Sequence, residues 1–292
     1  MRFGVLLIPT DPWPQAVRRA RYLESLGFAH LWTYDHLSWQ RYRDDPWFGA
    51  IPWLTGIAAA TSTIRLGTMV TSPNFRHPVT LAKDAMTLDH ISAGRVSLGI
   101  GAGGIGFDAT VFDQPILTPG QRAARMRDFV EVLDELLRNP VVSGDNPTYP
   151  VHEARMIPGC VQRPRVPLVI AATGPKTITL AAERGDAWLT EGDPTDPEPT
   201  RDSAESAIRR QVQLLDDKCA EVGRDPASID RVLLVSNRAE RPLTDMATFA
   251  DFVARYEALG FTDIVLHDPR PADPYWNDDP AMIEAVAAEF VS

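Results

Sequence analysis

The chain has 292 residues, 44% of them hydrophobic and 23% charged, and this ordinary composition argues against intrinsic disorder, collagen-like repeats and coiled coils. Its 39 acidic and 29 basic residues give a net charge of −10, so a nucleic acid would meet net repulsion and is not an expected partner. The apolar start stops at Pro9, far short of the roughly 18 residues that cross a bilayer, and Cys160 and Cys219 lack the spacing of a metal site or a disulfide framework, so we expect a cytoplasmic protein without a membrane segment.

Short apolar or β-branched runs alternate with longer amphipathic segments over almost the whole chain, which is typical of repeated strand and helix units around a parallel sheet. In chain order, the expected strands are 3–8, 31–34, 64–70, 96–100, 168–172, 187–190, 232–236 and 264–267. The expected helices are 14–26, 52–61, 78–91, 119–137, 175–184, 203–222, 244–259 and 280–291. Several of them open with proline, which suits the first turn because its missing N–H would have no partner there.

Eight strand and helix pairs predict a single α/β domain over residues 1–292, a (β/α)8 TIM barrel, in preference to an open doubly wound sheet. The longest irregular stretches, 36–51 and 139–167, have no linker composition, and we interpret them as functional insertions after strands. A third irregular stretch, 191–200, is rich in Asp and Pro. In such a barrel the active site lies at the carboxyl ends of the strands, so the residues that leave each strand are the ones to inspect.

Polar residues and glycines gather at these predicted strand ends. The positions are Thr10, Asp11, Asp35, His36, Thr71, Ser72, Gly101, Ala102, Gly103, Gly104, Thr173, Gly174, Glu191, Asn237, Arg238, His267 and Asp268. Among them Asp11, Glu191 and His267 are candidate substrate contacts. Trp39 is a fourth candidate, and it lies with Trp47 in an aromatic-rich excursion that forms either a substrate wall or the core of a folded-back loop.

Four sequence blocks carry a family resemblance. They are LWTYDHL (31–37), IRLGTMVTSPNFRHPVTLAKDAMTLDHISAGRVSLGIGAG (64–103), LTPGQRAARMRDFVEVL (117–133) and VQRPRVPLVIAATGPKTITLAAERGDAW (161–188). Each block is weak alone, but their order and spacing are specific. Over residues 3–190 the chain resembles the bacterial-luciferase-like superfamily of flavin- or deazaflavin-dependent oxidoreductases, and particularly its shorter members that use coenzyme F420. The last hundred residues resemble the superfamily only in the alternation of strands and helices.

The segment AATGPKT (171–177) passes from a strand into a helix, so backbone N–H groups should face the space above the barrel, where an anion fits. The resemblance implies that this turn, formed by Thr173, Gly174, Pro175, Lys176 and Thr177, binds the phosphate of the cofactor and that the lysine adds a movable positive charge. A strand-to-helix turn without a ligand is the alternative.

The glycines of GIGAGG (99–104) end a strand without leading into a helix, so they do not form a dinucleotide-binding fingerprint. The resemblance implies that Gly101, Ala102 and Gly103 lie beside the ribityl chain or the ring of the cofactor. An ordinary tight turn is the alternative.

In GTMVTSP (67–73) members of the superfamily commonly hold a non-proline cis peptide behind the ring. The resemblance places this peptide between Met69 and Val70, where the residues alone indicate an ordinary strand. It also places Ser72 within reach of phosphate or ribityl oxygens.

His36 is the candidate for proton transfer, because hydride transfer to or from a C=O, C=N or activated C=C bond needs a matching proton and imidazole titrates near neutrality. The resemblance implies this role or, alternatively, only a hydrogen bond to the cofactor ring. Asp35 is expected either to tune the imidazole or to face the other way, because neighbours in a strand point to opposite faces.

The resemblance and the short chain favour F420 over FMN, with hydride transfer to or from a small molecule of secondary metabolism. An FMN-dependent monooxygenase served by a flavin reductase, and a non-catalytic flavin-binding relative, are the alternatives. Sugar-phosphate oxidation is disfavoured because relatives that perform it carry an acid at the position of Gly104. No metal is expected, since the chain lacks HExxH and a His-x-His after the first strand. The resemblance also implies a homodimer.

Overall fold

The computed structural model describes residues 1–236 and 239–291, so the predicted strand-end pair Asn237 and Arg238 lies outside the described residues. Parallel strands close into one barrel in the order β1-β10-β9-β8-β7-β4-β3-β2. Their bounds are β1 Arg2–Leu7, β2 His30–Thr33, β3 Arg65–Thr71, β4 Val96–Ile100, β7 Leu168–Ala171, β8 Ala187–Thr190, β9 Asp230–Leu234 and β10 Asp263–His267. Each matches a predicted strand closely, which confirms the (β/α)8 barrel.

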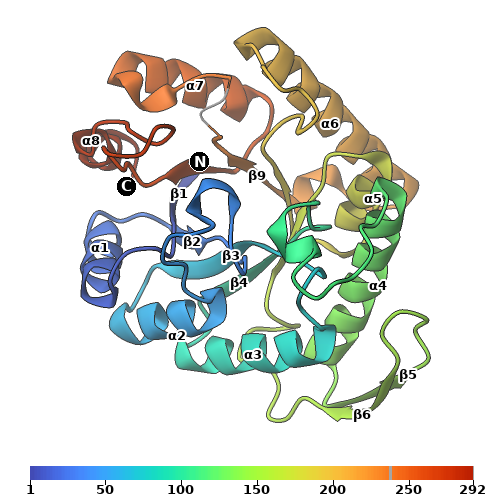
Figure 1. The fold of residues 1–292 in the computed structure, drawn as a ribbon. Coiled ribbons are helices and arrows are strands. Elements are labelled where there is room, and N and C mark those ends of the chain that lie inside the picture. The colour runs from blue at the N-terminus through green and yellow to red at the C-terminus, as the bar shows by residue number, and fades with distance from the viewer. Residues whose placement is uncertain (237–238, 292) are drawn as a thin grey trace.

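The helices surround the barrel in chain order (Figure 1). Their bounds are α1 Trp13–Ser25, α2 Ala50–Ala60, α3 Pro78–Ile91, α4 Pro119–Arg138, α5 Pro175–Arg184, α6 Arg201–Glu221, α7 Met246–Ala258 and α8 Ala281–Phe290. Proline stands at one of the first two positions of α1, α3, α4 and α5, as its missing N–H allows. In the part of the chain that the structure describes, no helix is both long and apolar enough to cross a membrane.

Side chains alternate between the inside and the outside of the barrel. Leu6, Trp32 and Met69 belong to the buried cluster that fills the barrel, whereas Val5 and Leu31 belong to the larger cluster under the helices. Because successive residues of a strand point to opposite faces, even-numbered positions along β2 point inward and odd-numbered ones outward. The same alternation determines whether each polar residue that follows β2 points into the barrel or outward.

The stretch 139–167 corrects one expectation. It follows helix α4, not a strand, so it lies at the amino ends of the barrel strands, and it is not irregular throughout. It contains an antiparallel hairpin of β5 Val141–Gly144 and β6 Val151–Arg155, which projects beyond α3 and α4 (Figure 1). Only one of the four residues of β5 is buried, so the apolar alternation that would announce a strand is missing. The stretch 36–51 does follow a strand, as expected.

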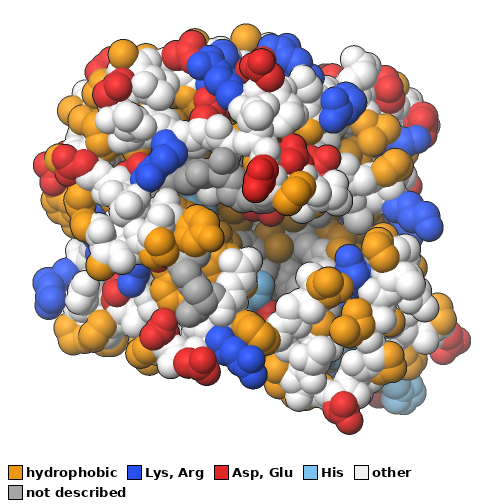
Figure 2. All heavy atoms as spheres, turned by 45° about the horizontal axis from the view of Figure 1, so that its top comes forward, with side chains coloured by type: hydrophobic (Ala, Val, Ile, Leu, Met, Phe, Trp, Pro, Cys, Tyr) orange, Lys and Arg blue, Asp and Glu red, His pale blue; other side chains and the backbone are white. Residues whose placement is uncertain are grey.

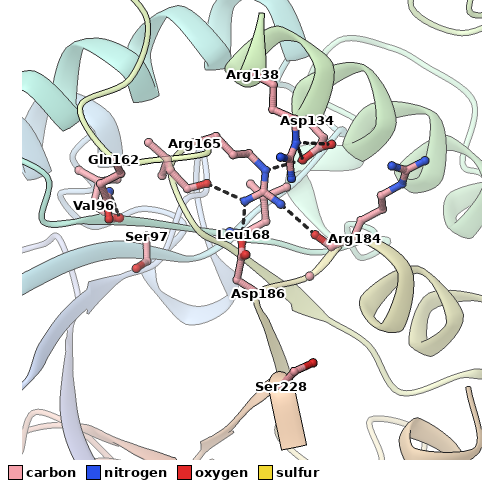
Figure 3. Close-up of polar contacts among 12 residues, drawn as sticks. Val96, Ser97, Asp134, Arg138, Gln162, Arg165, Leu168, Arg184, Asp186 and Ser228 are labelled. Atoms are coloured by element: carbon pink, nitrogen blue, oxygen red, sulfur yellow. Dashed lines mark hydrogen bonds and ion pairs between the residues drawn. The ribbon is translucent and has the colours of Figure 1, made fainter. Parts of the chain in front are cut away.

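At the amino end of the barrel, a cluster of ion pairs joins the starts of β7 and β8 to the ends of α4 and α5. Arg165, which is 3% exposed, donates hydrogen bonds to Asp134 and, at 2.5 Å, to Asp186, and its third nitrogen donates to the carbonyl oxygen of Arg184 at 3.0 Å (Figure 3). Arg138 also donates to Asp134, at 2.9 Å. These helix and strand ends are thereby tied together, which fits a stabilising role for this face.

Candidate active site

The opposite face, where the strands end, carries the candidate site. Figure 2 shows a hollow in the molecular surface, with hydrophobic side chains and a histidine inside it. Two kinds of loop surround this mouth of the barrel. We call the loops after β4 and β7, with Gly101, Gly103 and Gly174, the glycine side, and the loops after β2 and β10, with Trp39 and Trp276, the aromatic side.

The glycine side joins two segments that are far apart in the sequence. Strand β4 pairs with β7, with Ile100 opposite Ile170, so the loop 101–104 and the turn 172–175 leave the barrel side by side. A Cβ on Gly101 would lie 2.6 Å from a methyl carbon of Val70, and Gly103 has a φ of +77° and packs against Asn74. Both positions therefore require glycine. The predicted cis peptide between Met69 and Val70 is confirmed, and Ser72 is buried directly after β3.

The turn into α5 leaves room and hydrogen-bond donors. Gly174 is the N-cap residue, and no side chain caps the helix. A Cβ at Gly174 would meet nothing within 4 Å. Pro175 occupies the first turn, so the backbone N–H groups of Lys176 and Thr177 are the donors that a helix start leaves unpaired. Such a helix start suits an anion, because its donors and the positive end of the helix dipole act together. Thr173 precedes the cap and is exposed.

Arg125 is a site residue that the sequence reasoning missed. Its Nη2 donates a 2.5 Å hydrogen bond to Asn74 Oδ1, and Asn74 in turn donates to the carbonyl oxygen of Gly104 at 3.1 Å. Its Nε is buried without a partner, and among the described residues no carboxylate pairs with the guanidinium. Burial lowers the pKa of this guanidinium. A cation without a counter-ion thus lies under the β4 loop, and nothing but its place in the third resemblance block could have indicated it.

His36 contacts a carboxylate, but not the predicted one. Its Nδ1 lies 2.5 Å from Asp108 Oδ2, and Asp108 Oδ1 accepts a 2.8 Å hydrogen bond from the backbone N–H of Leu37. Asp108 belongs to a short 3-10 helix, Phe107–Ala109, in the loop after β4. The pair therefore links the aromatic side to the glycine side. No local sequence pattern could have predicted that His36 contacts Asp108, which lies 72 residues away.

Asp35 faces away from His36, which confirms the second of the two alternatives for this residue and rules out its catalytic role as a partner of the imidazole. Its carboxylate is 1% exposed and accepts hydrogen bonds from Arg76 at 2.7 and 3.0 Å and from the hydroxyl of Thr71. Burial alone would lower the pKa of Arg76, but the bond to Asp35 raises it. The alternation along β2 explains the outcome, because an odd-numbered residue points outward between the barrel and the helices.

The aromatic side is closed by its own packing. Trp39 stacks on Tyr34 at 4.9 Å and on Trp276 at 5.8 Å between ring centroids, and Trp276 stacks on His267 at 4.3 Å. The hydroxyl of Tyr42 donates to Asp273, so the loop after β2 is bonded to the loop after β10. Of the two interpretations left open for the aromatic excursion, the core of a folded-back loop describes most of it.

The predicted substrate contacts separate into two groups. His267 is 5% exposed, with Nδ1 2.9 Å from the carbonyl oxygen of Val235 and Nε2 2.7 Å from the hydroxyl of Tyr34, so both ring nitrogens are engaged. Asp11 accepts two 3.1 Å hydrogen bonds from Arg270 on the same side of the mouth. Glu191 is exposed after β8, across the barrel from β2. The structure thus brings Trp39, His36, His267 and Asp11 to one side and leaves Glu191 on the other.

The fold is that of a (β/α)8-barrel protein, and its candidate ligand site lies at the carboxyl ends of the strands. The family model described as luciferase-like monooxygenase matches residues 1–239, and the chain belongs to this family. The chain is 28% identical to a 5,10-methylenetetrahydromethanopterin reductase of Archaeoglobus fulgidus, over 91% of this chain and 73% of that protein. It is 29% identical to an F420-dependent glucose-6-phosphate dehydrogenase of Beutenbergia cavernae, over 92% and 89%.

Solved structures support the fold. An F420-dependent secondary alcohol dehydrogenase in complex with an F420-acetone adduct superposes with a TM-score of 0.78 at 18% identity, covering 99% of that chain and 100% of this one. A monooxygenase of Streptomyces bottropensis superposes with a TM-score of 0.76 at 22% identity, covering 99% and 100%. Since both kinds of enzyme share the barrel, the fold alone does not select between them.

Proposed function

We propose that this protein is an oxidoreductase that uses coenzyme F420 to transfer a hydride to or from a small molecule. Support comes from the relatives whose names state F420 chemistry and from one observation on the chain itself. The helix start at Gly174 lies open beside the glycine-rich segment 101–104 after β4, a space suited to a planar ring with an anionic tail.

The residues of the glycine side fit such a cofactor. The N–H groups of Lys176 and Thr177, together with the Arg125 guanidinium, whose Nε has no partner, would hold its anionic groups. Gly101 and Gly103 would let the ring system approach the backbone, with Met69 and Val70 behind it. When bound, F420 supplies the carbon that accepts or donates the hydride.

The aromatic side supplies the proton chemistry. His36 is 27% exposed at its side chain and is the titratable residue that follows β2 into the mouth. In a reduction it would give a proton to the oxygen or nitrogen of the substrate while the substrate carbon receives the hydride, and in an oxidation it would take that proton. Trp39 would form the wall beside the substrate.

A second candidate function follows from the family description itself. An FMN-dependent monooxygenase would use the same glycine side, because FMN also carries a phosphate, and it would need a partner flavin reductase. We rank it second because the two relatives reported above are reductases or dehydrogenases. We do not propose sugar-phosphate oxidation for this chain. Relatives that perform it carry an acidic residue directly after the glycine loop, and this chain has the exposed Gly104 there.

Fluorescence titration of the purified protein with F420 and with FMN tests the proposal. We expect F420 to bind with a dissociation constant in the micromolar range or below, and at least tenfold more tightly than FMN. Tighter binding of FMN, together with oxygen uptake when a flavin reductase is added, would reverse the ranking. The same preparation tests the expected homodimer, since light scattering should give twice the 32.3 kDa of one chain.

A further inference from the structure

Asp108 is buried within a loop that is otherwise exposed. The loop after β4 presents Ile105, Val111, Phe112 and Ile116 to solvent with exposed fractions between 53% and 65%, yet Asp108 is 6% exposed. A buried carboxylate needs hydrogen-bond donors in place of water. Asp108 has two, the backbone N–H of Leu37 at 2.8 Å and Nδ1 of His36 at 2.5 Å.

The contact fixes which ring nitrogen carries the proton. Within residues 1–236 and 239–291, no lysine or arginine pairs with Asp108. The guanidinium of Arg43 lies over the ring of the neighbouring Phe107, 4.5 Å from its centroid. An ionised carboxylate only accepts hydrogen bonds, so Nδ1 of His36 must be the donor. A neutral imidazole has a single N–H, and therefore Nε2 is unprotonated.

The imidazole is also held in place by its neighbours. The ring centroid of His36 lies 5.9 Å from Tyr34, 6.0 Å from Trp39 and 6.1 Å from Trp47. The indole Nε1 of Trp47 donates a 2.8 Å hydrogen bond to the carbonyl oxygen of His36, which fixes the backbone as well. In the described part of the chain Nε2 has no hydrogen-bond partner, so it is the nitrogen available to a molecule in the mouth.

We propose that Asp108 is a positioning residue that holds His36 as the Nδ1–H tautomer and leaves Nε2 as the proton acceptor at the mouth. The catalytic meaning rests on the proposed function. In an oxidation the O–H or N–H bond of the substrate would break as Nε2 gained the proton, and F420, when bound, would supply the acceptor for the hydride that leaves the substrate carbon. A reduction would reverse both transfers. A proton exchanged at oxygen or nitrogen suits an alcohol and its carbonyl compound, or an amine and its imine.

Two-bond ¹H–¹⁵N correlation spectra of the histidine rings test the tautomer at pH 9, above the range in which an ordinary histidine titrates. The chain has six histidines, and His36→Gln identifies the signal that disappears. We expect the wild-type His36 ring to carry its proton on Nδ1. In Asp108→Asn the amide NH2 can donate to Nδ1 while its oxygen accepts from Leu37, so the proton should move to Nε2.

Asp113→Asn is the matched control, because Asp113 is exposed in the same loop and does not contact His36. This variant should keep the wild-type tautomer. A wild-type ring with a proton on Nε2, or an Asp108→Asn ring that keeps the proton on Nδ1, overturns the proposal. The wild-type spectrum alone decides the matter if Asp108→Asn fails to fold.

The spectra require no cofactor, which separates this proposal from the proposed function. F420 titrated into Asp108→Asn should bind within threefold of its wild-type dissociation constant, because Asp108 is not assigned to the cofactor. Absence of F420 binding to the wild-type protein with the expected tautomer would reject the function and support the positioning role. F420 binding with the opposite tautomer would reject the positioning role alone.

Discussion

The two sides of the barrel mouth are built in opposite ways. On the aromatic side, large side chains from the loops after β2 and β10 stack on one another, and Trp276 is 5% exposed. On the glycine side, a Cβ at Gly174 would meet nothing within 4 Å, and backbone donors face open space. One side is thus filled by its own packing, which stabilises the fold, whereas the other leaves the open space in which we propose that the cofactor binds, the proposed cradle.

Asp108 joins these two sides. It reaches from the loop after β4 on the glycine side to His36 on the aromatic side. A single hydrogen bond between Asp108 and His36 would thus fix the proton carrier relative to the loop beside the proposed cofactor site.

Trp276→Ala should have the largest effect and should act on stability. Removal of this indole empties the stack with Trp39 and His267, and the loss of a buried large aromatic costs about 3 kcal/mol. Urea unfolding measures this change. Because the cradle lies on the other side, the F420 dissociation constant should stay within threefold at temperatures where the variant is folded. A variant as stable as wild type would show that the aromatic side is not a packed wall.

His36→Ala should separate chemistry from binding. General acid–base catalysis typically supplies a factor of about 10² or more, so turnover should fall by about that factor at saturating F420. The measurement uses whichever alcohol or amine a substrate screen returns. F420 affinity should remain within a few-fold of wild type. Weak F420 binding with turnover preserved would instead assign the histidine to the cofactor ring.

The amino end of the barrel is a third region, apart from the two sides of the mouth. It can be probed by measuring the free energy of unfolding as a function of pH. Burial would raise the pKa of Asp263, but contacts with His30 and Arg2 lower it to about 2. A carboxylate with a depressed pKa stabilises the fold above its unfolded value near 4 and loses that contribution as the pH falls toward 2. The free energy of unfolding should therefore drop by about 2 kcal/mol more over this window in wild type than in Asp263→Asn. If the free energy of unfolding changed equally with pH in wild type and in Asp263→Asn, Asp263 would not stabilise the fold in this way.

Gly174→Val should have the smallest effect in free energy, and only on binding. The added Cβ would meet nothing within 4 Å, so the midpoint of thermal unfolding should change little, but the side chain occupies the space above the helix start. F420 affinity should fall at least tenfold, about 1.4 kcal/mol. Gly144→Val is the matched control, because a Cβ there also meets nothing within 4 Å and β5 lies at the other end of the barrel.

The sequence predicts the barrel well because each of its strands and helices has a recognisable local sequence pattern. Apolar runs of four to seven residues and proline-opened helices recur along the chain, and their number leaves few topologies. The hairpin of β5 and β6 escapes prediction for the same reason, since its exposed strands have no apolar face. The outward direction of Asp35 was predictable from strand alternation, although its partner Arg76 was not.

The site is less predictable because its key contacts join distant segments. Asp108 lies 72 residues from His36 in a loop without periodicity, and no spacing rule pairs them. Arg125 resembles any other arginine on a helix until its unpaired, buried Nε is seen beneath the β4 loop. His267 stands at a strand end like a substrate contact, yet its two nitrogens are engaged by Tyr34 and Val235. The position of a residue along its strand predicts at which end of the barrel it lies. Its hydrogen-bond partner can be known only from the packing of the folded chain.

The most direct test of the account is the F420 dissociation constant of the wild-type protein measured beside that of Gly174→Val. We predict binding at micromolar concentration or below for wild type and at least tenfold weaker binding for the variant, with unchanged thermal unfolding. No F420 binding by the wild-type protein, or equal affinity in the two proteins, would contradict the claim that the glycine side is the cradle of a deazaflavin.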